Sequence, residues 1–70
     1  MQPLLTIIVN GQQRTAKPGA TVSDLLHEMS LDPGRVAIER NLEILSRADW
    51  QKTTIQTGDR YEIVQFVGGG

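Results

Sequence analysis

Three consecutive glycines, Gly68, Gly69 and Gly70, close the sequence and directly follow an apolar stretch, residues 60–67, that is typical of a β-strand. Glycine has no Cβ and loses the most backbone entropy on ordering, so these residues are expected to form a tail and not to pack. Three extended residues span about 10 Å. The pattern predicts a rigid strand that holds an α-carboxylate on Gly70 just beyond the domain. A frayed chain end is the alternative interpretation.

The α-carboxylate expected on Gly70 is the reactive group that the sequence offers. With an ordinary pKa of about 3.3–3.7, it is an anion at neutral pH and a poor electrophile. Reaction there needs a leaving group, most simply AMP, supplied from ATP by a partner enzyme. A side chain at Gly69 or Gly70 would obstruct entry into a narrow channel and close approach of the adenylate.

Other candidate chemistry is weaker. His27, the single histidine, falls on the polar face of a predicted helix and is expected to be solvated. Ser23 and Asp24 lie near it, but capping and solubility explain them better than a catalytic triad does. The glycines open no helix and precede no phosphate-loop lysine. The remaining carboxylates show no metal-ligand spacing and are expected at the solvated surface; they are Glu39, Glu43, Asp49, Asp59 and Glu62.

Composition limits the class of protein. Seventy residues suit one small domain, and the absence of cysteine excludes disulfides, thiolate metal sites and a thiol nucleophile. Seven basic and eight acidic residues give a net charge of -1, which argues against binding to nucleic acid or an anionic membrane. No apolar run approaches the roughly 20 residues of a membrane span, and the first residues do not resemble a signal peptide. A soluble, cytoplasmic protein that is monomeric by itself is expected.

The first half of the chain predicts a hairpin and a helix. An apolar run at residues 4–9, the turn pair Asn10-Gly11 and a polar stretch at residues 12–16 predict two antiparallel strands. Thr21 can cap a helix of about ten residues, with Asp24 as its capping-box partner. The apolar positions of this helix share one face and are Val22, Leu25, Leu26 and Met29.

The second half predicts three further strands. Two short ones are expected at residues 36–38 and 42–45, although Leu42 occupies a turn position where glycine would be easier. Residues 46–52 are expected to form an irregular or single-turn segment, with Trp50 as a packing residue over the sheet edge. A turn at residues 57–59 then leads into the final strand.

This order, β-β-α-β-β-β, predicts an α+β fold. The first and last strands are the most apolar, so they are expected to lie as parallel neighbours in the middle of a mixed sheet of four to five strands, with the helix on one face. This is the β-grasp arrangement, with a domain at residues 1–67 and a tail at residues 68–70. The predicted core is Leu5, Ile7, Val9, Val22, Leu25, Leu26, Met29, Val36, Ile38, Leu45, Ile55, Tyr61 and Ile63.

Alternation along the last strand suggests a docking surface. If Tyr61 and Ile63 face the helix, Val64 and Phe66 lie on the other face as an exposed apolar patch beside the tail. Strand twist or packing at the sheet edge could instead bury Phe66. Both interpretations remain open at this stage.

The most specific motifs lie at residues 36–44, 46–50 and especially 57–70, which end in the glycines, and they are accompanied by the Asn10-Gly11 turn and the helix entry at residues 18–22. In these motifs the sequence resembles the ThiS family of sulfur carriers in thiamine biosynthesis. The resemblance implies a ubiquitin-like β-grasp fold and a protein that is a co-substrate, not an enzyme. It also implies that Gly70 carries the sulfur, while Gly68 and Gly69 thread the tail into partner enzymes.

In this family the terminal carboxylate is adenylated by an E1-like enzyme, ThiF, which uses ATP. A persulfide donor, such as a cysteine desulfurase, then converts it to a thiocarboxylate, which gives its sulfur to thiazole synthase, ThiG. The resemblance implies no cofactor bound to the carrier itself. Two alternatives remain: a carrier of the molybdopterin synthase small-subunit type, and a ubiquitin-like modifier or interaction module. Against the former, that family has a proline-containing segment where Phe66-Val67 stands here.

Overall fold

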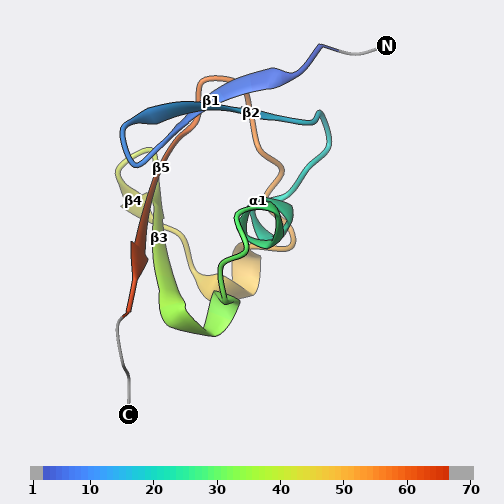
Figure 1. Ribbon diagram of the computed structural model, residues 1–70. Coiled ribbons are helices and arrows are strands. Elements are labelled where there is room, and N and C mark those ends of the chain that lie inside the picture. The colour runs from blue at the N-terminus through green and yellow to red at the C-terminus, as the bar shows by residue number, and fades with distance from the viewer. Residues whose placement is uncertain (1–2, 67–70) are drawn as a thin grey trace.

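The computed structural model describes residues 3–66 (Figure 1). It contains one five-stranded sheet, one α-helix and two 3₁₀ turns. The helix is α1 (Val22–Glu28), and the 3₁₀ turns are η1 (Pro33–Arg35) and η2 (Arg47–Asp49). The strands are β1 (Leu5–Val9), β2 (Gln12–Ala16), β3 (Val36–Arg40), β4 (Glu43–Ile44) and β5 (Arg60–Gln65).

The sheet has the strand order β2-β1-β5-β3-β4. β1 and β5 are parallel, and the remaining neighbours are antiparallel. In Figure 1 the helix lies on one side of this sheet, and the other face has no helix over it. The mixed sheet and single helix confirm the predicted β-grasp fold, with the first and last strands as parallel neighbours.

The β1–β2 and β3–β4 hairpins have tight turns of the same kind. Asn10 and Gly11 both have positive φ, 51° and 80°, as a type I′ turn requires. Asn41 and Leu42 repeat this conformation with φ values of 51° and 73°. Leu42 therefore belongs to the turn and not to β4, and it occupies the position at which glycine is preferred.

Local signals set both ends of the helix. Thr21 and Asp24 form the predicted capping box, in which each side chain accepts a hydrogen bond from the other residue's backbone N–H. The helix is shorter than the ten residues expected, because Ser30 takes a positive φ of 58° directly after the C-cap. The N–H groups of Ser30 and Leu31 donate back to His27 and Leu26, which closes the helix in a Schellman motif.

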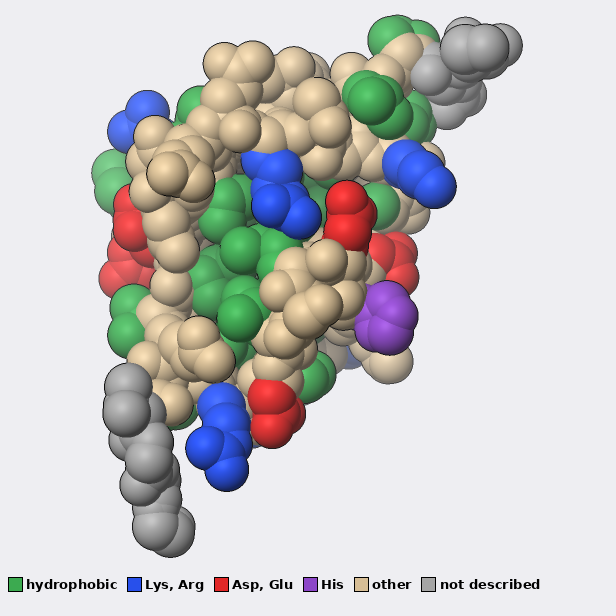
Figure 2. All heavy atoms as spheres, in the orientation of Figure 1, with side chains coloured by type: hydrophobic (Ala, Val, Ile, Leu, Met, Phe, Trp, Pro, Cys, Tyr) green, Lys and Arg blue, Asp and Glu red, His purple; other side chains and the backbone are tan. Residues whose placement is uncertain are grey.

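The core fills the space between the sheet and the helix, where hydrophobic side chains gather in Figure 2. Ten of its buried residues were predicted; Ala16 and Trp50 complete it. Trp50 is buried at η2 and donates its indole N–H to the Leu45 carbonyl at 3.0 Å. Three residues predicted as core are only partly buried against it, and these are Leu5, Met29 and Leu45.

Candidate functional site

The strand that precedes the glycines is held from both sides. β3 pairs along β5 from Tyr61 to Gln65, and the Phe66 N–H donates to the Arg35 carbonyl at 2.7 Å. β1 pairs with the start of β5, at Arg60 and Tyr61. The chain is therefore paired in the sheet as far as Gln65, and Phe66 is hydrogen-bonded to η1. Gly68, Gly69 and Gly70, the predicted site of chemistry and tail, lie outside the described residues.

The Asn10 side chain extends the short contact between β1 and β5. Its Nδ2 donates to the Ile63 carbonyl at 3.1 Å, and its Oδ1 accepts from the Ile63 N–H at 2.7 Å. The amide thus copies the donor and acceptor of a strand neighbour, just where β1 turns away. The hairpin turn consequently stabilises β5 as well as β2.

Asp59 corrects the expectation that every carboxylate is solvated. It is only 4% exposed, directly before β5. Burial by itself would raise the pKa of Asp59, but the hydrogen bonds that its carboxylate accepts outweigh this and lower the pKa below 3.8. The donors are the Gln56 N–H at 2.9 Å, the Tyr61 hydroxyl at 2.8 Å, Asn41 Nδ2 at 3.2 Å and Arg40 Nε at 3.2 Å.

The buried carboxylate also fixes the protonation of its neighbour. Burial and the hydrogen bond to Asp59 raise the pKa of Tyr61 to about 12, so the hydroxyl stays a donor throughout the neutral range. Through Arg40 and Asn41 the same carboxylate connects the start of β5 to the β3–β4 hairpin. The network anchors the base of the strand that leads to the glycines.

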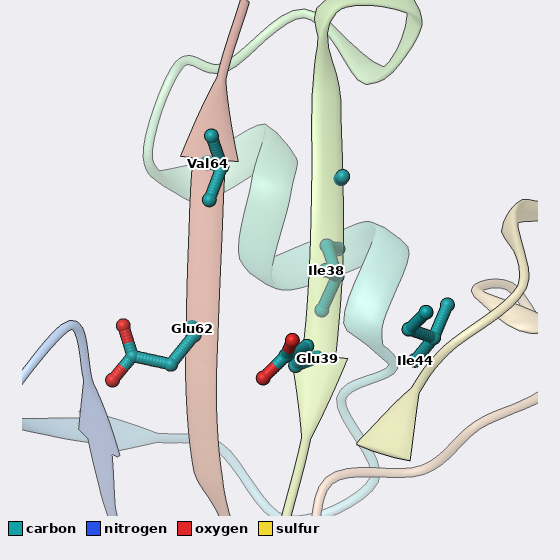
Figure 3. Close-up of a pocket in the computed structure, with 6 residues that line it drawn as sticks. Ile38, Glu39, Ile44, Glu62 and Val64 are labelled. Atoms are coloured by element: carbon teal, nitrogen blue, oxygen red, sulfur yellow. The ribbon is translucent and has the colours of Figure 1, made fainter. Parts of the chain in front are cut away.

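The outer face of the sheet, opposite the helix, carries exposed apolar side chains. Val64 and Phe66 are 58% and 51% exposed, so the alternative in which Phe66 is buried is wrong. Val64 lies across from Ala37 on β3, and Ile44 on β4 is 85% exposed. Together with Glu39 and Glu62, the residues Ala37, Ile44 and Val64 line a shallow groove, here called the outer groove (Figure 3).

Ala37 and Ile44 were not predicted as part of this surface, although the sequence held a signal for Ile44. Leu45 was assigned to the core, and neighbouring strand residues point to opposite faces, so Ile44 had to face outward. Ala37 is identified by its pairing with Val64, which requires knowledge of the β3–β5 register.

His27 and Ser23, two further residues considered for chemistry, lie on α1. His27 is exposed, as predicted, and Ser23 is partly buried at the start of α1. Within residues 3–66, no three His, Asp or Glu side chains come together as metal ligands would. In the same part of the chain, no helix is both long enough and apolar enough to cross a membrane.

Comparison with known proteins identifies the family. The model of the ThiS family matches residues 7–70, which is most of the chain and includes the three glycines. The chain belongs to the ThiS family. A solved structure of the thiamine biosynthesis protein ThiS from Geobacter metallireducens is similar with a TM-score of 0.80 and 32% identity, covering 94% of this chain and 100% of that one.

The relatives of this ThiS-family chain include a sulfur carrier protein and a thiazole synthase. The sulfur carrier protein ThiS of Bacillus subtilis is 36% identical, with 89% of this chain and 96% of the relative covered. A thiazole synthase of Paramagnetospirillum magneticum is 39% identical over 94% of this chain, but the match spans only 20% of that protein. The chain thus corresponds to about a fifth of the length of a much longer synthase.

Proposed function

We propose that this protein is a sulfur carrier for formation of the thiamine thiazole, and that Gly70 carries the sulfur. The observation that carries this proposal is the family match, which runs through the predicted tail to residue 70. Likeness to the carrier of Bacillus subtilis over nearly its full length supports it. On this proposal the chain is a co-substrate of its partner enzymes and not a catalyst.

The proposed chemistry takes place at the carboxylate of Gly70. Its oxygen attacks the α-phosphorus of ATP on an E1-like enzyme of the ThiF type, and pyrophosphate leaves. The terminal sulfur of a persulfide, held by a donor such as a cysteine desulfurase, then attacks the acyl carbon, and AMP leaves. A second thiol reduces the resulting acyl disulfide and releases the thiocarboxylate, whose soft sulfur is delivered to thiazole synthase, ThiG.

The described part of the chain supports this role by positioning. Strand pairing holds β5 in the sheet as far as Gln65, a hydrogen bond to Arg35 of η1 holds Phe66, and the Asp59 network fixes the start of the strand. The described part of the chain therefore ends at a fixed position, close in sequence to Val64 and Phe66. We propose these two side chains as the apolar contact that docks a partner enzyme while Gly68 and Gly69 thread toward its active site.

A loading reaction followed by mass spectrometry tests the proposal. The chain is incubated with the adenylating enzyme, ATP and a persulfide donor, and it should gain the mass difference of one sulfur replacing one oxygen. Omission of ATP is the control. A conjugate of higher mass with a lysine of another protein would instead identify a ubiquitin-like modifier, and an unchanged mass would refute both functions. Transfer of the sulfur to the pterin precursor of molybdopterin, in place of the thiazole, would assign the carrier to the other pathway.

A further inference from the structure

Two glutamates lie directly opposite one another on the exposed face of the sheet. Glu39 on β3 pairs with Glu62 on β5, and both are exposed beside the outer groove (Figure 3). Side chains at directly opposed positions have Cβ atoms only about 4.5–5.5 Å apart, and like charges there are destabilising. In Figure 3 the Glu62 side chain extends away from β3. Because the pair is unfavourable for folding, its presence suggests a role in binding.

No cation of the described chain neutralises this pair. Within residues 3–66, four ion pairs form, and none of them includes Glu39 or Glu62. Arg60 lies on the same face of β5, two residues before Glu62, but makes no ion pair with either glutamate in that part of the chain. The nearby Arg40 is bound to Asp59. The acidic pair is therefore available to a cation from outside.

The residues around the glutamate pair indicate which chemical groups a partner surface would need. Ala37, Ile44 and Val64 supply apolar lining of the outer groove, and the two glutamates belong to the same lining. A guanidinium is the complementary cation, because its planar fork donates to two carboxylates at once. An aliphatic side chain beside it would cover the apolar part of the groove.

Charge also excludes other occupants. A second copy bound through the same face in a symmetric dimer would bring two acidic pairs together, which is repulsive. Nucleic acid and an anionic membrane would be repelled for the same reason. A protein with a basic, partly apolar surface remains. The thiazole synthase of Paramagnetospirillum magneticum contains a segment similar to this chain within a much longer protein, which favours a thiazole synthase as the partner.

We infer that the outer groove docks thiazole synthase, which places an arginine guanidinium between Glu39 and Glu62 and an aliphatic side chain over Ala37 and Val64. This inference rests on the proposed function, whose partner it describes in chemical terms. It assigns a role to two residues that fold stability would not select.

The test uses the whole, unloaded chain and purified thiazole synthase from the same organism. Affinity is measured by calorimetry for the wild-type chain and for the double variant Glu39→Gln/Glu62→Gln. Affinity should fall about tenfold at low salt, and the difference should shrink at high salt as screening weakens the wild-type complex. The melting temperature of the double variant should rise by roughly 1–5 °C, because the like-charge contact is removed.

Glu28→Gln is a control for charge loss away from the groove, since it removes one carboxylate, against two in the double variant, from an exposed position on the helix side. It should bind the synthase as the wild-type chain does. If the double variant also binds with wild-type affinity, or if it loses affinity only for the adenylating enzyme, the inference is overturned. Failure of the proposed function would show separately, as a chain that is never loaded with sulfur in the mass-spectrometric assay.

Discussion

At the scale of single residues, the backbone of Leu42 is the clearest departure from what the amino acid prefers. Its φ of 73° lies in the left-handed region, which costs a residue with a Cβ about 1–2 kcal/mol. The side chain is 84% exposed, so little packing compensates. The turn forms because Asn41 and the two flanking strands impose it.

Leu42→Gly should therefore stabilise the protein by about 0.5–1 kcal/mol, since relief of the strained φ exceeds the greater entropy of glycine in the unfolded chain. Urea unfolding measures the change. Leu4→Gly provides a control, because it removes an exposed leucine from a position without positive φ. If both variants are destabilised equally, the turn is not strained.

The buried carboxylate of Asp59 makes a prediction about pH. Its pKa is lower in the folded protein than the ordinary 3.8, so the folded state favours the charged form. This contribution to stability is fully present above the unfolded pKa and is lost as the pH falls through the folded pKa. Acid unfolding should therefore begin below about pH 4.

Asp59→Asn should lose at least about 1–3 kcal/mol of stability at neutral pH, because four donors lose a charged acceptor. The decline of the melting temperature between neutral and acid pH should also be shallower than in the wild-type protein. Asp49→Asn, at an exposed residue of η2, serves for comparison. If the melting temperature of Asp59→Asn falls with acid pH as steeply as that of the wild-type protein, the assigned role is contradicted.

At the scale of elements, β1 pairs with only the start of β5, and the Asn10 side chain supplies the next hydrogen bonds along that edge of β5. The Asn10 amide makes both hydrogen bonds to Ile63 that a longer β1 would have made. Asn10→Gly keeps the positive φ of the turn and removes the side chain that carries the amide. We expect a loss of about 1–2 kcal/mol and faster hydrogen exchange of the Ile63 amide proton, followed by NMR. Exchange at Ile63 that stays as slow as in the wild-type protein would show that water replaces the amide at no cost.

The sequence predicts the elements well where their signals are local. Asn10-Gly11 specifies its turn, and Thr21 with Asp24 specifies the start of the helix, because each acts within four residues. Asp59 was misjudged because it follows a glycine turn and has the usual features of a solvated turn residue. Its burial depends on Arg40 and Asn41, which are 19 and 18 residues away and reach it only once β3 and β5 pair.

Val64 on β5 and Phe66 directly after it are expected to contribute to partner binding and little to stability. Val64→Asp and Phe66→Asp should each weaken binding to a partner enzyme about tenfold or more, because a charge enters an apolar contact. Their melting temperatures should change little, since both side chains are more than half exposed. Calorimetric titration with the adenylating enzyme and thiazole synthase, paired with thermal unfolding, measures both effects. A large fall in melting temperature with intact binding would place these residues in the core instead.

At the scale of the whole molecule, the fold and the proposed chemistry lie in different parts of the chain. The buried core runs from Ile7 to Ile63, and the Asp59 network and the paired part of β5 are complete by Phe66. The residue proposed to carry sulfur comes four positions later, at Gly70. Changes at the last glycine are therefore expected to affect loading without affecting stability.

Deletion of Gly70 and the substitution Gly70→Val should each abolish sulfur loading in the mass-spectrometric assay and leave the melting temperature almost unchanged. Deletion moves the carboxylate one residue short of the reacting atoms, and valine adds a branched side chain beside the acyl carbon where close approach is needed. Gly68→Ala tests whether the requirement is specific to the terminus, because one methyl group three residues from β5 should reduce loading far less. If the Gly70 variants melt at a much lower temperature, the last residue contributes to the fold; if they load normally, sulfur is not carried at Gly70, and the proposed function fails with it.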